Sequence, residues 1–278
     1  MRNVRSNWFR GLLAFAAAAS LCGPQLTATP VSPMRRWFES AQSCARHGQY
    51  EKALGMYSKL MDDWRRKPEL HTAIGDAQMG LKRYDEAVAS YRTAIACSPK
   101  HVPARLDLAR ALAAQGDRDA ACKELNEVTR LAPRCEESHL LRSRLLREQG
   151  RPREALPVIQ AALAFRSGSV EGTEELARVY LALGWANDAL AAAMRAVSLK
   201  PRWAGTHALL ATAYEAGKQA EKAVPELECA ARLAPDDISV HEQLASLYEL
   251  LGMAQKAATQ RALLGRLKGQ DKPAESHP

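Results

Sequence analysis

The sequence predicts an all-α protein assembled from a repeated helical unit, and three observations indicate this fold class. The chain of 278 residues is 47% apolar and 25% charged, and only 6% of its residues are aromatic. Alanine and leucine, which lose little conformational entropy in a helix, outnumber β-branched residues. Small residues recur at every thirty-fourth position along the body of the chain. A fixed period of this length is typical of stacked helical repeats.

Two sets of small residues carry the period. One set is seven alanines in step without an insertion or deletion: Ala53, Ala87, Ala121, Ala155, Ala189, Ala223 and Ala257. The other set stands twelve residues earlier in each unit: Ala41, Gly75, Ala109, Ser143, Ala177, Ala211 and Ala245. Because the distance between two packed helices depends on the side chains at the contact, we expect both sets to lie where two helices cross closely.

Glycine and proline mark the ends of the expected helices. A glycine precedes the alanine by five residues at Gly48, Gly116, Gly150, Gly184 and Gly252. There a left-handed residue would end the first helix of the unit. A proline follows the alanine by twelve residues at Pro99, Pro133, Pro201 and Pro235, where it would stop the second helix. Each unit is therefore expected to be two amphipathic helices joined by a turn.

A helix–turn–helix unit repeated at this period resembles the tetratricopeptide repeat family. The segment IGDAQMGLKRYDEAVASYRTAIACSPK carries the family's signature at Gly75, Tyr84, Ala87, Tyr91, Ala94 and Pro99. The resemblance implies a right-handed superhelical solenoid in which the first helices line a concave groove. It divides the chain into a leader at 1–33, a polar tail at 272–278 and seven units at 34–67, 68–101, 102–135, 136–169, 170–203, 204–237 and 238–271.

The match departs from the family's pattern near the start of the units. The tryptophan that the family places there survives only as Trp37, and histidine stands in its place at His71, His139, His207 and His241. Adjacent units lie about 9–10 Å apart at ordinary helix-packing distances, whereas a zinc ligand must lie within about 2.1 Å of the metal. We therefore expect these histidines to pack inside the fold, and we expect no metal site.

Residues 1–33 look like a targeting segment. Residues 1–11 contain three arginines and no acid, and an apolar run follows at 12–22. A basic start followed by a short apolar stretch is typical of a secretory signal, so we expect export or membrane tethering. A mitochondrial transit peptide and an uncleaved cytoplasmic chain remain the alternatives. Five of the 39 basic residues lie within 1–36, so the net charge of +8 gives little support to nucleic-acid binding by the folded part.

The cysteines and the catalytic motifs give no sign of an enzyme. Six cysteines are present, no two form a C-x-x-C pair, and five lie in the body of the chain, where we expect free thiols packed as small apolar residues. The sequence contains no H-E-x-x-H, no G-x-S-x-G and no phosphate-binding loop. The sequence therefore predicts a non-enzymatic protein that needs no cofactor.

Four arginines are the candidate partner-binding residues. In the family that the chain resembles, positions 2, 5, 6, 9, 12 and 13 of each unit face the groove. Position 9 holds Arg110, Arg144 and Arg178 in three consecutive units, and Arg147 lies one turn beyond Arg144. Guanidinium groups bind carboxylates through paired hydrogen bonds, which suggests an acidic or C-terminal peptide as the partner.

The alternative for the same arginines is pairing within their own helices. Acidic residues stand three or four positions away from Arg110, Arg144 and Arg178, at Asp107, Glu148 and Glu174. The two-carboxylate clamp by which some family members hold chaperone tails is not matched, because no three consecutive units supply its residues. Two units, for example, carry Phe38, Gln42, Pro103 and Asp107 at clamp positions.

The sequence thus predicts a scaffold that holds a partner peptide or helix in its groove. The alternative is a permanent structural subunit or assembly factor of a larger membrane-associated, secretion or organellar complex, because Leu263, Leu264 and Leu267 give the last helix an apolar side with no capping helix after it. The junction between units four and five is expected to be a hinge, because the segment AFRSGSVEG stands there in place of the usual proline and Gly168 and Gly172 loosen the link.

Overall fold

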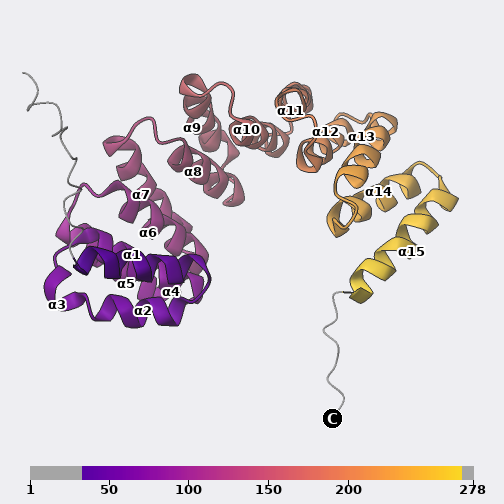
Figure 1. The fold of residues 1–278 in the computed structure, drawn as a ribbon. Helices are drawn as coiled ribbons and strands as arrows, with labels where there is room; N and C mark the ends of the chain where they lie inside the picture. The colour runs from indigo at the N-terminus through magenta and orange to yellow at the C-terminus, as the bar shows by residue number, and fades with distance from the viewer. Residues whose placement is uncertain (1–32, 271–278) are drawn as a thin grey trace, which may run out of the picture. The chain divides into compact units, whose positions relative to one another are not determined.

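The structure, a computed structural model, describes residues 33–270 and is all-helical over that range (Figure 1). The prediction of an all-α fold is confirmed. The expected targeting segment, except for its last residue, and the polar tail lie outside the described residues. No helix in 33–270 combines the length and the apolar character needed to cross a membrane.

Fifteen helices make up the described part of the chain. They are α1 (Pro33–Arg46), α2 (Tyr50–Ser58), α3 (Met61–Trp64), α4 (Pro68–Gly80), α5 (Tyr84–Cys97), α6 (Val102–Gln115), α7 (Arg118–Leu131), α8 (Glu136–Glu148), α9 (Pro152–Phe165), α10 (Val170–Ala182), α11 (Ala186–Leu199), α12 (Ala204–Ala216), α13 (Ala220–Leu233), α14 (Ile238–Leu250) and α15 (Ala254–Gln270). They fall into two compact units that meet in sequence between Arg65 and Arg66.

The N-terminal unit holds α1, α2 and α3 around one aromatic cluster. The Phe38 ring lies 5.7 Å from the Tyr57 ring and 5.3 Å from the Trp64 ring, centroid to centroid. The single second helix expected here is broken between α2 and α3. The amide of Leu60 donates to the carbonyl of Tyr57, three residues back rather than four, so the chain tightens and places Leu60 in the interior.

The C-terminal unit contains α4 to α15, and its helices pack in chain order. Each even-numbered helix packs against the odd-numbered helix that follows it, and that helix packs in turn against the next even-numbered one. We call α4, α6, α8, α10, α12 and α14 the first helices, and α5, α7, α9, α11, α13 and α15 the second helices. The division into seven units of equal length stays a prediction.

The small residues lie at buried helix crossings, as the sequence predicts. All seven periodic alanines from Ala53 to Ala257 are buried, and so is every member of the earlier set from Ala41 to Ala245. Gly75 shows why small side chains are needed. A Cβ atom on this residue would lie 2.6 Å from Cε1 of the buried Tyr91 ring, well inside van der Waals contact.

The turns and helix ends follow the predicted glycines and prolines. The five glycines have φ angles between +71° and +92°, in the left-handed region. At the two equivalent turns without glycine, Lys82 and Lys218 adopt the same conformation with φ of 59° and 58°. The helices that precede the four prolines each end two residues earlier, at Cys97, Leu131, Leu199 and Leu233.

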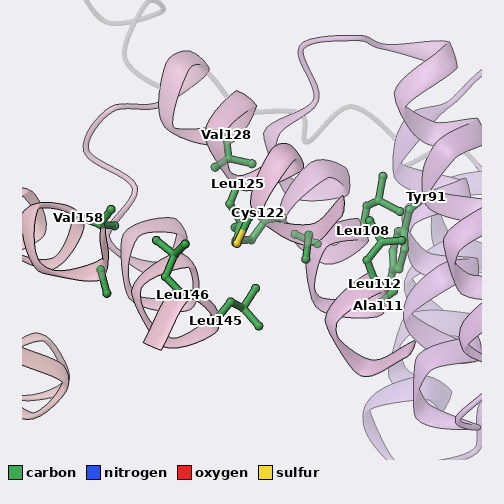
Figure 2. Close-up of a cluster of buried hydrophobic side chains, with 14 of the residues drawn as sticks. Tyr91, Leu108, Ala111, Leu112, Cys122, Leu125, Val128, Leu145, Leu146 and Val158 are labelled. Atoms are coloured by element: carbon green, nitrogen blue, oxygen red, sulfur yellow. The ribbon is translucent and has the colours of Figure 1, made fainter. Parts of the chain in front are cut away.

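The hinge predicted between α9 and α10 stays a prediction, and the junction itself is closely packed. One hydrophobic cluster continues from α5 to α10, where Val179 belongs to it. Leu125 is fully buried in this cluster (Figure 2). Ser169 caps α10 by accepting the amide of Gly172 at 2.9 Å. Gly172 does not loosen the link; it lets α10 approach α9, because a Cβ there would lie 2.9 Å from Leu163. Arg195 also donates to the carbonyl of Ser167 at 2.7 Å.

Candidate partner-binding surface

The candidate surface is one side of the first helices. We define the first-helix face as the residues at positions 2, 5, 6, 9, 12 and 13 of α4, α6, α8, α10, α12 and α14. With 3.6 residues per turn these positions share one side of each helix. Ion pairs join the face from α6 to α8 and from α8 to α10, while α4 packs on α6 and α12 packs on α10. All four candidate arginines lie on it.

Arg110 is held by two acids. Its guanidinium donates to Asp107 on the same helix and to Glu137 on α8. The Asp107 contact is the pair expected within the helix, while the Glu137 contact spans 27 residues of sequence and was not foreseen. The guanidinium group of Arg110 is therefore already paired with two carboxylates of the protein itself.

Arg147 forms the most buried ion pair on this surface. Its Nε donates to Oε1 of Glu175 at 3.0 Å, and a second nitrogen lies 3.4 Å from Oε2. The side chain of Glu175 is 2% exposed, and the hydroxyl of Ser143 lies 3.5 Å from its Oε1. The pair joins α8 to α10 directly across the junction where the hinge is predicted. A buried carboxylate of this kind depends on its cation for stability.

Arg178 and Arg144 differ in their surroundings. Arg178 donates to Glu174 at 3.0 Å, which is the expected pair four residues apart. Arg144 is exposed and has no ion pair or hydrogen bond with the described residues. Its expected partner Glu148 lies instead 3.8 Å from Arg118 on α7. Of the four candidate arginines, only Arg144 is free to bind an anion without breaking an existing pair.

An acidic cluster lies on the same face beside Arg110. The Tyr91 hydroxyl on α5 donates to Asp76 on α4 at 2.8 Å. Burial raises the pKa of Asp76 to about 6, while the hydrogen bond from Tyr91 and the charge of Arg110 work against the rise and the neighbouring Asp107 adds to it. Burial also raises the pKa of Asp107, opposed by Arg110. The charge of Arg110 thus opposes the rise in pKa of both Asp76 and Asp107.

The four periodic histidines are all buried, as predicted, and three of them bind a proline carbonyl. Nε2 lies within 3.0 Å of the carbonyl of the proline six residues earlier for His139, His207 and His241. Nδ1 of His207 bonds to Glu226, and Nδ1 of His241 bonds to Gln260, each nineteen residues later. No cluster of three or more possible metal ligands occurs within residues 33–270.

His139 lacks the second partner that its counterparts have. Its Nδ1 is buried with no hydrogen-bond partner, and the residue nineteen positions later is Val158. The His139 ring instead lies 5.6 Å from the ring of Phe165, which gives Nδ1 no acceptor or donor. The same arrangement occurs without histidine at Arg105, which bonds both to the carbonyl of Pro99 and to Glu124.

Some exposed features were not predicted from the sequence. Trp185 and Trp203 are about half exposed; Trp185 stacks on Tyr180, and Lys200 lies 4.0 Å above the Trp203 ring. A shallow depression lies beside Trp185, between the α10–α11 turn and the α12–α13 turn at 216–218. No disulfide joins the five cysteines within 33–270, and only Cys122 of them is buried.

Comparisons with known proteins identify the repeat type. Two family models, both described as tetratricopeptide repeat, match residues 38–102 and 80–145. No curated protein matches the chain significantly.

Solved structures with the same fold include three of particular relevance. A tetratricopeptide repeat protein from Parabacteroides merdae is 16% identical with a TM-score of 0.71, and the match covers 87% of this chain and 94% of that one. The match to the APC/C hetero-tetramer Cut9–Hcn1 is 20% identical with a TM-score of 0.65 and covers 84% of this chain but only 46% of that one. YrrB, described as a TPR protein with an unusual peptide-binding site, is 16% identical with a TM-score of 0.54, covering 67% and 96%. Identities this low establish the fold alone.

Proposed function

Because the chain belongs to the tetratricopeptide repeat family, we propose that it is a scaffold that holds a segment of a partner protein on its first-helix face. Proteins of this family generally act as scaffolds without catalysis, and the description of YrrB names a peptide-binding site in a protein of the same fold. The observation that carries the proposal is the first-helix face itself, where neighbouring first helices bring exposed charged side chains onto one side of the C-terminal unit. We propose that the chain itself catalyses no reaction.

Site-specific photo-crosslinking tests the proposal. A photo-reactive amino acid replaces Arg144 on α8, and in a matched control it replaces Met194, which is 51% exposed on the second helix α11. The native source extract supplies the partner. We expect a discrete crosslinked protein from position 144 and none from position 194. Equal crosslinking at both positions, or at 194 only, would contradict binding on the first-helix face.

A permanent structural subunit is the second candidate, because apolar side chains are exposed at the last helix pair. Leu250 is 72% exposed and Met253 is 39% exposed. The residues named from the sequence are less open than expected, since Leu264 is buried and Leu263 and Leu267 are half-buried. Arrays of repeats need a polar terminal surface for solubility, so such an end favours coverage by another chain. A stable monomer in sedimentation at high protein concentration would count against this candidate.

Export or membrane tethering through residues 1–33 is a further part of the proposal, with a mitochondrial or cytoplasmic location as the alternatives. It is supported by the arginines and the apolar run of that segment alone. The intact mass of the native protein, measured separately in soluble and membrane fractions, tests it. Loss of roughly the first 22–28 residues would fit a cleaved signal. Retention of Met1 in the soluble fraction would contradict targeting.

A further inference from the structure

The first-helix face is acidic although the whole chain is basic. Its described residues include four arginines, no lysine and eleven acids. The acids are Glu69, Asp76, Asp107, Glu137, Glu148, Glu171, Glu174, Glu175, Glu215, Glu242 and Glu249. The formal net charge of the chain is +8, so the excess of basic residues lies elsewhere. Much of it lies in the leader, in the turns and on α15, which carries four basic residues and no acid.

Pairing within the protein leaves more free acids than free bases on this face. Three of the four arginines are bound to acids, as described above. Glu69, Glu171 and Glu215 have no ion pair with the described residues, and Asp76 is bound only by the Tyr91 hydroxyl. Arg144 is the single free cation among the described residues of the face. A second protein that approaches the face therefore meets a surplus of unpaired negative charge.

Several of these acids stand where the fold itself disfavours them. Glu148, Glu215 and Glu249 lie in the last turns of α8, α12 and α14. The helix dipole favours cations at that end and disfavours carboxylates. Arg118 and Arg261 neutralise Glu148 and Glu249, but nothing described neutralises Glu215, and burial raises its pKa. An unpaired acid at this position does not serve the stability of the helix, which points to a role in binding.

We infer that the partner segment is basic, with lysine or arginine side chains that bind the free acids of α4, α10 and α12 on the first-helix face. The inference rests on the proposed scaffold function and names the chemistry of its partner. It reverses the expectation of an acidic peptide, because three of the four arginines behind that expectation are already occupied. Cations from the partner would form ion pairs with Asp76, Glu171 and Glu215 without breaking an existing ion pair.

A selection from a random peptide library against the immobilised full chain tests the inference. The wild type is compared with a face variant, Asp76→Asn, Glu171→Gln and Glu215→Gln together. A control variant removes the same number of charges elsewhere, through Asp188→Asn, Glu221→Gln and Asp236→Asn. These three acids are exposed, outside the face and without an ion pair to the described residues. Thermal unfolding of both variants verifies that they fold.

The expected pool from the wild type is enriched in lysine and arginine. Three exposed ion pairs at about 0.5 kcal/mol each correspond to about a tenfold loss of affinity in the face variant, and we expect less than about a twofold loss in the control. Enrichment of acidic or neutral peptides would overturn the inference and leave the scaffold proposal standing. Equal losses in the two variants would also overturn it. No enrichment of any peptide would count against the scaffold proposal itself.

Discussion

The buried helix crossings and the first-helix face of the C-terminal unit are built on different rules. At the crossings a small residue returns at every thirty-fourth position, and each copy is buried. On the face, position 9 alone holds an acid at Asp76, arginine at Arg110 and a hydroxyl at Thr212. The difference shows that packing fixes the interior in every repeat, whereas the face can vary from repeat to repeat and so can encode a partner.

The Arg147–Glu175 pair on the first-helix face contributes to the stability of the fold. Breaking it is expected to give the largest loss of stability among these predictions. Arg147→Ala leaves the carboxylate of Glu175 buried without its cation, so we expect a loss of about 3 kcal/mol in the free energy of unfolding, measured with urea. Arg178→Ala removes a pair whose arginine is 36% exposed, and it should cost less than about 1 kcal/mol. Adding Glu175→Leu to Arg147→Ala should recover most of the loss. Equal losses of unfolding free energy in the two arginine variants would show that burial does not determine how much each ion pair contributes to stability.

Gly75 tests the rule of the crossings. Gly75→Ala places a Cβ against the buried Tyr91 ring, and we expect it to lower the free energy of unfolding by about 2 kcal/mol. Gly265→Ala in α15 is the matched control, because nothing lies within 4 Å of the added atom. It should raise stability by about 0.5–1 kcal/mol through the better helix propensity of alanine. Both variants can be measured by chemical denaturation. A neutral Gly75→Ala would mean that the crossing is loosely packed.

Val158 is where the interior pattern fails, and the failure can be repaired. Val158→Gln places an amide nineteen residues after His139, as Gln260 stands after His241. A partner for the orphaned Nδ1 should raise the free energy of unfolding by about 1 kcal/mol, net of the lost apolar contact. The same substitution in a His139→Leu background should give no gain. A gain in both backgrounds would show that the histidine nitrogen is not the cause.

The two left-handed lysines offer a smaller gain. Lys82→Gly and Lys218→Gly remove a side chain from a conformation that non-glycine residues rarely adopt. The added freedom of glycine in the unfolded chain offsets part of the benefit, so each should raise stability by about 0.5 kcal/mol. The reverse change, Gly116→Ala, should lower it. Thermal unfolding of the three variants under one buffer condition measures these effects. A loss of stability in both lysine variants would contradict the claim that the left-handed conformation of these lysines is strained.

Asp76 gives the face a small dependence on pH. Its pKa in the folded protein is about 6, above the value of 3.8 for an unperturbed carboxyl. The folded state therefore binds the proton more tightly, so stability should rise as the pH falls through 6 and level off near 4. Because Asp76 is partly exposed, we expect less than about 0.5 kcal/mol. Asp76→Asn should flatten this part of the stability curve; an unchanged slope would assign it to another group.

The contrast between the buried helix crossings and the first-helix face also explains which features could be predicted from the sequence. The buried alanines, the left-handed glycines and the prolines that stop helices could be predicted because each acts locally and repeats. The left-handed Lys82 and Lys218 could be found only by counting one repeat period from a glycine, since lysine itself gives no such signal. The close contact between α8 and α10 could not be predicted, because it depends on Arg147 meeting Glu175 across 28 residues.

The candidate site was predicted in position but not in its electrostatics. Arg110 and Arg178 pair within their helices as spacing allows, but Glu148 turns to Arg118 and leaves Arg144 free. Side chains on a helix surface choose among several neighbours, and the choice depends on how adjacent helices pack. The arginines stand out in sequence because they share one register, whereas the acids around them occupy different positions and form no such pattern.

Binding of a basic partner segment to the first-helix face can be observed helix by helix. Hydrogen exchange of the full chain is measured with and without the tightest peptide from the library selection. We expect slower amide exchange in α4, α10 and α12 on binding, and unchanged exchange in α5, α11 and α13. Protection confined to those second helices would place the peptide on the opposite side of the repeats and rule out the first-helix face as its binding surface.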